Sequence, residues 1–163
     1  MSAPSNLGLI ALLLAGLMIG GAQFMEHVLG LDPCALCLMQ RLWTVFGGAA
    51  VLAGLAYDPR SRGFPITALA CTTVGAGFSV RQLWLQSLPP DAVPACGPDM
   101  AYMIDAFPLS EILRTMTLGT GNCAKVDWSL FGISIAGYAL VGFIVLAGIL
   151  CGWIATARRP TNG

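Results

Sequence analysis

Hydrophobic residues gather into four long segments of the chain, and polar residues are confined to the stretches between them. The first segment, residues 7–24, contains no charged side chain, and the others cover about 36–57, 64–86 and 130–157. A helix of about 20 apolar residues is long enough to cross the ~30 Å hydrocarbon core of a bilayer. The pattern therefore predicts an all-α integral membrane protein, a four-transmembrane-helix bundle that forms one domain over residues 1–163.

The first apolar segment has a second interpretation, because a cleaved signal peptide also contains an apolar run. Residues 20–22, Gly-Gly-Ala, would then be the small-residue cleavage site. A signal peptide needs positive charge before its apolar run, and residues 1–6 contain no Lys or Arg. We therefore expect this segment to be kept as a transmembrane helix.

Composition agrees with a location in the lipid bilayer. Hydrophobic residues make up 56% of the chain and charged residues only 10%, whereas a soluble domain averages about 25% charged residues. Mean hydropathy is +0.77. Net charge is zero, and no basic cluster indicates nucleic-acid binding. A transporter or channel would need polar or broken segments in mid-membrane, but the ionisable residues here cluster at one edge.

Residues 87–129 form the one long polar segment and are expected to be a loop outside the membrane. Lys and Arg mark the cytoplasmic side of short loops and ends. Arg60 and Arg62 lie in the turn between spans two and three, and Arg158 and Arg159 lie in the tail. The long loop has two basic and five acidic residues. We therefore expect both termini in the cytoplasm and the long loop in the periplasm of a bacterium.

A Cys-x-x-Cys pair, Cys34 and Cys37, lies where the second predicted span begins, on the same side as the long loop. Asp32 is a suitable helix cap and Pro33 a suitable first helical residue. The positive end of the helix favours a thiolate at Cys34, and Arg41, one turn after Cys37, favours one there. The pattern predicts a reactive dithiol. Its alternatives are a structural pair and a zinc site, which would need ligands beyond the chain's one histidine.

Two arginines, Arg41 and Arg81, are predicted at similar depth in the outer leaflet. No Asp or Glu lies within the predicted spans to pair with them. Charge within a bilayer is costly, so such side chains either extend to the interface or serve a function. The functional interpretation is a polar pocket beside Cys37 for a partly anionic group.

The long loop carries a second cysteine pair, Cys96 and Cys123. A disulfide between them is either a structural staple or a bond that Pro- and Gly-rich flanks present to a partner. Between them, apolar residues recur at helical spacing over residues 109–116, which predicts a short amphipathic helix in the membrane interface. Cys71 and Cys151 lie within predicted spans and have no assigned role.

Together these features resemble the DsbB family of disulfide bond formation proteins over nearly the whole chain. The resemblance implies a quinone-dependent thiol oxidase of the bacterial inner membrane. Such a protein reoxidises a periplasmic DsbA-like protein of thioredoxin fold and passes electrons to the quinone pool and the respiratory chain. The segments that carry the resemblance are Glu26-His27-Val28, Pro33-Cys34-Ala35-Leu36-Cys37 with Arg41, Trp84-Leu85-Gln86-Ser87-Leu88-Pro89, Pro94-Ala95-Cys96-Gly97-Pro98, and Gly121-Asn122-Cys123-Ala124 with Trp128.

The resemblance also implies a role for each cysteine of the two pairs. Cys96 would be attacked by the reduced partner, and Cys123 would then attack Cys34. Cys37 would pass electrons to a quinone, ubiquinone or menaquinone, whose oxygen Arg41 would hold.

The chain departs from the family's best-known member at two places near the expected quinone. Gln40 stands where that member has a glutamate before the arginine. That member also has a histidine near the outer end of the third span, and this chain has none there. Arg81, Gln82 and Gln86 are the candidates to supply the missing hydrogen bond.

Three other interpretations stay open at this point. A vitamin K epoxide reductase-like protein has similar relay chemistry, but its loop pair precedes its membrane Cys-x-x-Cys along the sequence. A DsbB paralogue with one dedicated partner would have the same motifs. A four-span scaffold with structural disulfides would have inert disulfides and would bind no quinone.

Overall fold

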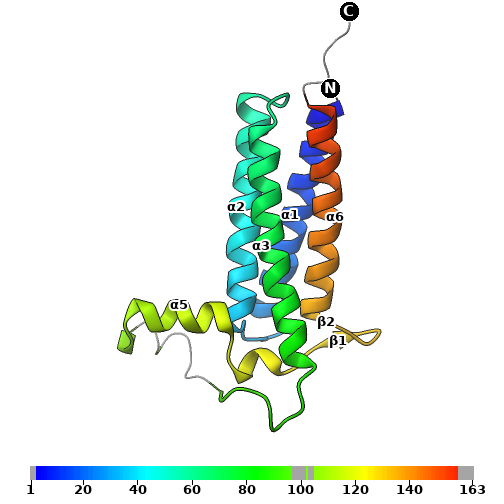
Figure 1. Cartoon of the computed structure of the whole chain (residues 1–163). Coiled ribbons are helices and arrows are strands. Elements are labelled where there is room, and N and C mark those ends of the chain that lie inside the picture. The colour runs from blue at the N-terminus through cyan, green and yellow to red at the C-terminus, as the bar shows by residue number, and fades with distance from the viewer. Residues whose placement is uncertain (1–2, 97–101, 103–104, 158–163) are drawn as a thin grey trace, which may run out of the picture.

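The computed structural model describes residues 3–96, 102 and 105–157, and four long helices lie side by side in it as a bundle (Figure 1). Each is long and apolar enough to cross a membrane. The predicted four-helix membrane bundle is therefore confirmed. The helices are α1 (Ala3–His27), α2 (Ala35–Tyr57), α3 (Gly63–Gln86) and α6 (Ile135–Thr156).

Small residues let the helices approach closely at the end of the bundle away from the long loop. Trp153 of α6 is fully buried there, and its indole N–H donates to the carbonyl of Pro59 at 2.8 Å in the turn between α2 and α3. A Cβ atom on Gly54 would come within 3.0 Å of the Trp153 ring, and one on Gly8 within 3.1 Å. The absence of side chains at these two glycines thus makes room for the ring, which ties α6 to α1 and α2.

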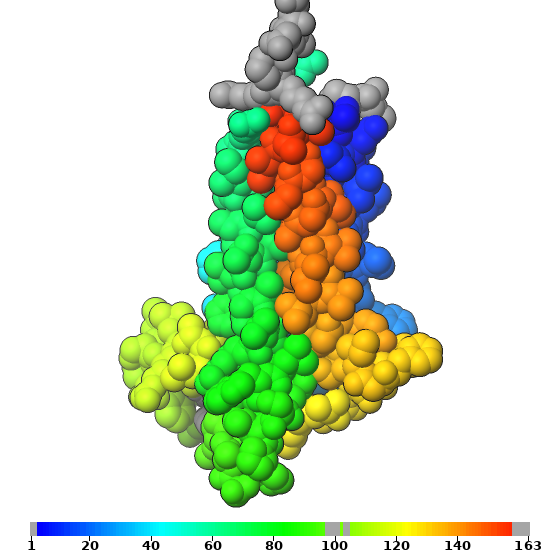
Figure 2. Space-filling model, turned by 45° about the vertical axis from the view of Figure 1, so that its right-hand side comes forward, coloured from blue at the N-terminus to red at the C-terminus, as the bar shows by residue number. Residues whose placement is uncertain are grey.

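The long loop closes the other end of the bundle. It contains α5 (Leu109–Leu118), the 3-10 helix η1 (Gly121–Ala124) and an antiparallel hairpin of β1 (Ser129–Leu130) and β2 (Ile133–Ser134). Helix α5 and the hairpin extend to opposite sides of the bundle (Figures 1 and 2). Strand β2 continues directly into α6, so the hairpin is fixed at the start of that helix.

Helix α5 is the amphipathic helix that the sequence predicts between the loop cysteines. It lies across the bundle axis (Figure 1), and its apolar residues Leu109 and Leu113 are exposed. The side chain of Arg81 in α3 holds its last turn, because its Nε donates to the carbonyl of Leu118 at 3.2 Å. The helix is confirmed, and its place in the membrane interface stays a prediction.

Two helix boundaries differ from the predicted spans. Helix α1 continues past the apolar run, which ends at residue 24, to His27, so Glu26 belongs to the helix. Helix α6 begins at Ile135, because residues 131–132 have positive φ values of 50° and 79° and turn the chain into the hairpin. Residues 158–159, which support the predicted orientation, lie outside the described residues.

Candidate functional site

Cys34 itself caps helix α2. Its backbone is extended (φ −72°, ψ 166°), and its sulfur accepts a hydrogen bond from the N–H of Cys37 at 3.4 Å. The prediction of Asp32 as cap and Pro33 as first helical residue is therefore wrong, because the helix begins two residues later, at Ala35. Cys34 still lies at the positive end of the helix, where the dipole favours a thiolate.

The sulfurs of Cys34 and Cys37 lie 2.8 Å apart and are not bonded to each other. Formation of a disulfide would shorten this separation by about 0.8 Å. Both side chains are half-buried at the first turn of α2. The pair can therefore pass between dithiol and disulfide with little movement of the helix.

Cys123 of η1 is fully buried beside the Cys-x-x-Cys. It packs with Ala35, Leu36 and Leu85 in a cluster that also includes Cys34. A hydrogen bond from the Cys34 thiol outweighs burial and lowers the pKa of Cys123 to about 6. The same contact raises the pKa of Cys34, so Cys34 keeps its proton in the reduced protein, and the predicted thiolate is found at Cys123 instead. At neutral pH Cys123 is therefore a thiolate next to Cys34, which is the arrangement of a nucleophile and its target.

The segment that ends in Cys96 lies against the segment that carries Cys123. The N–H of Gly121 donates to the carbonyl of Ala95 at 3.2 Å. A Cβ atom on Gly121 would lie 2.4 Å from the Pro94 carbonyl oxygen and 3.1 Å from the Cys96 nitrogen, so the close approach requires glycine. Cys96 is exposed. The cysteines thus follow one another from the exposed Cys96, through the buried Cys123, to the Cys-x-x-Cys pair.

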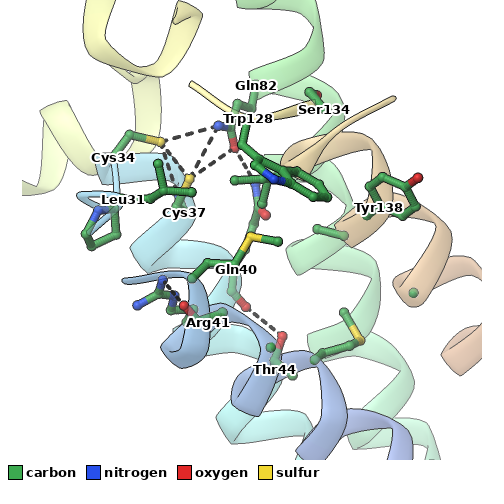
Figure 3. Close-up of a pocket in the computed structure, with 18 of the residues that line it drawn as sticks. Leu31, Cys34, Cys37, Gln40, Arg41, Thr44, Gln82, Trp128, Ser134 and Tyr138 are labelled. Carbon is green, nitrogen blue, oxygen red and sulfur yellow. Dashed lines mark hydrogen bonds between the residues drawn. The ribbon is translucent and has the colours of Figure 1, made fainter. Parts of the chain in front are cut away.

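Gln82 of α3 points at both sulfurs of the Cys-x-x-Cys (Figure 3). Its side-chain nitrogen donates to Cys37 at 3.3 Å and to Cys34 at 3.4 Å. Its oxygen accepts a hydrogen bond from the side chain of Gln40 at 2.8 Å. Both glutamines are buried, with exposed fractions of 4% and 7%. The structure therefore places this candidate quinone ligand against the thiols.

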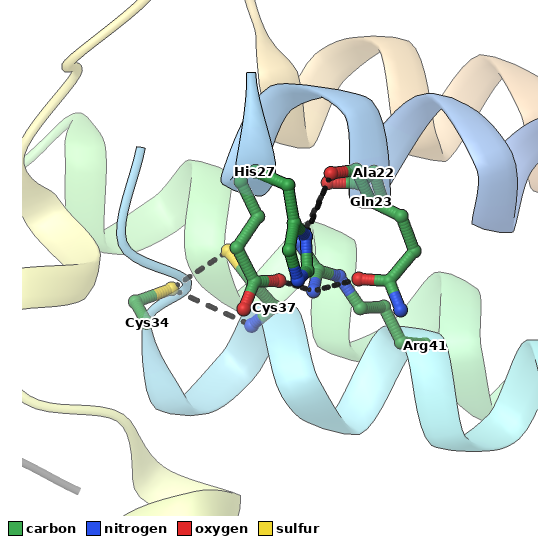
Figure 4. A network of polar contacts seen from close by, with 7 residues as sticks. Ala22, Gln23, His27, Cys34, Cys37 and Arg41 are labelled. Carbon is green, nitrogen blue, oxygen red and sulfur yellow. Dashed lines mark hydrogen bonds and ion pairs between the residues drawn. The ribbon is translucent and has the colours of Figure 1, made fainter. Parts of the chain in front are cut away.

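Arg41 is held by helix α1 (Figure 4). Its guanidinium pairs with the Glu26 carboxylate and donates to the Ala22 carbonyl at 3.0 Å and the Gln23 side chain at 3.4 Å. The expectation that Arg41 has no acidic partner is therefore wrong. The reason is that α1 runs on to His27 and carries Glu26 alongside α2.

A cavity of about 880 Å³ begins at the thiols and continues between α1 and α6. Cys37, Gln40, Arg41 and Gln82 line its polar end (Figure 3). Its volume lies within the range of about 300–1,000 Å³ typical of small-molecule sites. It suits a ligand with a polar head and a long apolar body. Side chains from the middle of α1 and α6 form the apolar end: Leu14, Leu17, Met18, Val141, Phe143 and Val145.

The other two predicted quinone ligands occupy different positions. Among the described residues, Arg81 does not line the cavity. Besides holding Leu118, its guanidinium lies 4.4 Å above the ring of Trp84. Gln86 does line the cavity, and it accepts a hydrogen bond from the Ser134 hydroxyl at 2.8 Å. The structure thus brings Arg41 to the cavity and places Arg81 on the α5 side of α3.

Comparison with known proteins assigns this architecture to a family. The family model for Disulfide bond formation protein DsbB matches residues 4–153. The chain belongs to the DsbB family. Because the chain has four apolar helices and belongs to this family, it is a multi-pass membrane protein that functions in disulfide bond formation.

DsbB relatives align with the chain over most of their length. Disulfide bond formation protein B of Hahella chejuensis is 46% identical over 153 residues, 91% of this chain and 90% of that one. The protein of the same name in Marinobacter nauticus is 44% identical, with 93% and 90% covered. Disulfide bond formation protein B 1 of Pseudomonas aeruginosa is 37% identical, with 91% and 93% covered. No solved structure gives a significant match.

Sequence reasoning missed two features of the site, the partner of Arg41 and the contact between two glutamines. Spacing places Glu26 on one helix face with Ala22 and Gln23, but it does not show that this face meets Arg41 on another helix. The contact of Gln40 with Gln82 also joins two helices, and it has no sign in the sequence either.

Proposed function

We propose that the protein is a quinone-coupled thiol oxidase that restores the disulfide of a periplasmic, thioredoxin-fold partner of DsbA type. It would take two electrons from the partner's dithiol and deliver them to the quinone pool and respiratory chain. The observation that carries the proposal is the contact of Cys123 with Cys34 and of Cys34 with Cys37, at the polar end of a long apolar cavity.

The cavity fits a quinone in both of its chemical parts. Arg41, Gln40 and Gln82 offer hydrogen-bond donors where a ring with carbonyl oxygens would lie. The whole cavity extends along α1 from Met25 to Leu14, about 16 Å at 1.5 Å per residue, and its apolar end suits an isoprenoid tail. When bound, the quinone would supply the acceptor for two electrons and two protons.

The first exchange requires an exposed disulfide with a good leaving group. In a Cys96–Cys123 disulfide, Cys96 is the accessible sulfur, and a thiolate of the partner would bond to it. The bond to Cys123 breaks, and Cys123 leaves as a thiolate. The Cys34 thiol, the main cause of the lowered pKa of Cys123, has no proton to donate while Cys34 is bonded to Cys37. Hydrogen bonds from Leu36 and Thr120 also lower the pKa of Cys123, and a thiol of lower pKa leaves faster.

The second exchange takes place between buried neighbours. The Cys123 thiolate attacks the sulfur of Cys34, so a Cys34–Cys123 bond forms and the Cys34–Cys37 bond breaks. The electron pair leaves on Cys37, which lines the cavity. The partner's second thiolate attacks the partner's own sulfur in the mixed disulfide, which frees Cys96 as a thiolate and releases the oxidised partner. Cys96 then attacks Cys123, which re-forms the Cys96–Cys123 bond and frees Cys34. The Cys34–Cys37 bond would form again as this dithiol gives two electrons and two protons to the quinone.

Arg41 and the start of α2 supply the electrostatics at the polar end of the cavity. A fixed cation and preorganised helix dipole stabilise negative charge in a site of low dielectric constant. Because Arg41 is held by α1, which is also one wall of the cavity, its position relative to a bound ligand is set before binding. This preorganisation favours electron transfer from Cys37.

The orientation in the inner membrane is part of the proposal. The turn with Arg60 and Arg62 lies at the opposite end of the bundle from α5 and the hairpin (Figure 1). The positive-inside rule therefore places that turn in the cytoplasm and the cysteine loops in the periplasm. The start of α1 and the end of α6 lie at the same end as the turn, on the cytoplasmic side.

The test is quinone absorbance in detergent-purified protein after addition of a reduced thioredoxin-fold partner. We expect wild type to reduce the quinone, Cys37→Ser and Cys96→Ser to be inactive, and Arg41→Met to be slowed. Cys151→Ser is the matched control, because that cysteine is exposed on α6 away from the site. A quinone left oxidised by wild type, with disulfides that resist the partner, would contradict the proposal.

A further inference from the structure

We propose that Gln82 is a catalytic residue that stabilises the Cys37 thiolate, and that Gln40 is the positioning residue that orients its amide. The inference rests on the proposed function in one respect, that Cys37 receives the electron pair when the Cys34–Cys37 bond breaks. Stabilisation of the Cys37 thiolate is thereby assigned to a neutral amide, whereas the sequence suggests Arg41 for this role.

The amide of Gln82 can serve both protonation states of Cys37. Its nitrogen lies 3.3 Å from the Cys37 sulfur and can donate to a thiolate. Its oxygen lies 3.6 Å from the same sulfur and can accept from a thiol. The same nitrogen lies 3.4 Å from Cys34, so one amide spans the bond that is made and broken.

Gln40 fixes which end of this amide faces the sulfurs. Its side-chain N–H donates to the Gln82 oxygen at 2.8 Å. If the Gln82 amide were flipped, its NH₂ group would face the Gln40 donor, and two N–H donors would meet without an acceptor. Both side chains are buried, so the loss of this hydrogen bond would be costly. The native orientation, with the Gln82 N–H toward the thiols, is therefore favoured.

Arg41 is less able to perform this task in the observed arrangement. Its guanidinium is directed to helix α1, where it pairs with Glu26 and donates to Ala22 and Gln23. Among the described residues, the side-chain N–H that reaches the Cys37 sulfur is that of Gln82. The Gln82 amide therefore contacts the Cys37 sulfur, and Arg41 lies further along the cavity.

A donor at Cys37 favours the reduced dithiol over the disulfide. Two-electron reduction of the Cys34–Cys37 bond places negative charge on Cys37, and a buried N–H aimed at that charge stabilises it. Loss of the donor should therefore make the thiolate scarcer and the reduction potential of the pair more negative. The thiolate fraction and the reduction potential can both be measured on the protein alone, without quinone or partner.

The test uses the full-length protein in detergent, stripped of quinone. One measurement is the alkylation rate of Cys37 in the reduced protein, followed peptide by peptide by mass spectrometry across pH. The other is the redox equilibrium of the Cys34–Cys37 pair with glutathione. For Gln82→Leu we expect alkylation near neutral pH to fall about tenfold, and the redox equilibrium to shift about tenfold toward the disulfide, or about 30 mV.

Three further variants separate hydrogen bonding from packing. Ser79→Ala is the matched control: it removes a buried hydroxyl about one turn earlier on α3, which donates to the Gly75 carbonyl at 3.4 Å and is not among the residues that line the cavity, and it should leave both readouts unchanged. Gln82→Glu keeps the size of the side chain but removes the N–H, and it should match or exceed the loss in Gln82→Leu. Gln40→Leu should give a smaller loss in both readouts, because the Gln82 amide can then turn around.

Unchanged readouts in Gln82→Leu and Gln82→Glu, relative to Ser79→Ala, would overturn the inference. If Gln82→Leu does not fold, Gln82→Glu and Gln40→Leu decide the question by the same readouts. Failure of the proposed function is distinguishable, because a wild-type protein that reduces no quinone can still show the dependence of Cys37 on Gln82.

Discussion

The carboxylate of Glu26 on α1 pairs with the guanidinium of Arg41 on α2, four residues after Cys37. An arginine at the edge of a membrane span is costly unless its charge and its hydrogen bonds are satisfied. Helix α1 meets this need with a carboxylate, an amide oxygen and a backbone carbonyl within two turns. The position of the arginine at the cavity is therefore set by a neighbouring helix rather than by α2 alone.

Replacement of Glu26 should impair the site more than replacement of its neighbour Gln23. In Glu26→Gln the arginine loses its counter-charge and its fixed position, and we expect kcat/KM for quinone reduction to fall about tenfold. Gln23→Leu removes only a neutral contact at 3.4 Å and should cost less than about threefold. Steady-state kinetics with a reduced partner measure both, and equal effects would contradict the assigned role of Glu26.

Gly121→Ala should separate the two cysteine segments of the long loop. The new methyl group would lie 2.4 Å from the Pro94 carbonyl oxygen, so the segment with Cys96 must move away. We expect oxidation of the partner to slow by about tenfold or more, since small misplacements of reacting groups have large effects on rate. Gly77→Ala is the control, because a Cβ there meets no atom within 4 Å. Partner oxidation that is equally fast in both variants would argue against this placement of Cys96.

The ionisation of Cys123 should follow from its contact with Cys34. With a pKa of about 6, Cys123 is mainly thiolate at neutral pH and becomes protonated as the pH falls through that value. The thiolate fraction should drop about tenfold between pH 7 and pH 5. The measurement is the ultraviolet thiolate absorbance of the reduced protein minus that of Cys123→Ser. A midpoint at or above the ordinary cysteine value, about 8.5, would show that Cys34 does not stabilise this thiolate.

A larger side chain at Gly21 should obstruct the apolar part of the cavity. Gly21 lines the cavity, and a Cβ there meets no atom within 4 Å, so Gly21→Leu fills open space without a clash at its first atom. We expect KM for a long-tailed quinone to rise about tenfold, with a smaller rise for a short-tailed analogue. Gly20→Leu makes the same change at an adjacent open position outside the described cavity lining. Equal KM values in the two variants would place the quinone elsewhere.

The fold could be predicted from the sequence because bilayer-spanning length and apolar composition are properties of continuous segments. The cysteine pairs could be located for the same reason, since motif spacing is local. The start of the last helix could not be predicted, because residues 130–134 are apolar enough to be taken for part of a span. The positive φ values at residues 131–132 decide that boundary, and Gly132 was the one sequence sign of it.

The contacts within the site depend on how the helices are rotated against each other. The apolar run that predicts the first span ends at Phe24, so the hydropathy pattern gives no reason to place Glu26 beside Arg41. The contact of Gln40 with Gln82 likewise depends on the packing of α2 on α3. A single sequence does not show how its helices are rotated and aligned against each other, so these interactions became visible only in the structure.

The most direct test of the relay is to identify the disulfide that joins the two cysteine pairs during turnover. Quinone-loaded protein is mixed with a reduced partner, quenched with acid at successive times, and its disulfides are mapped by mass spectrometry. The account predicts a transient Cys34–Cys123 disulfide that rises before the quinone is reduced and decays as reduction is completed. A Cys37–Cys123 disulfide in its place, or quinone reduction with no bond between the pairs, would contradict it.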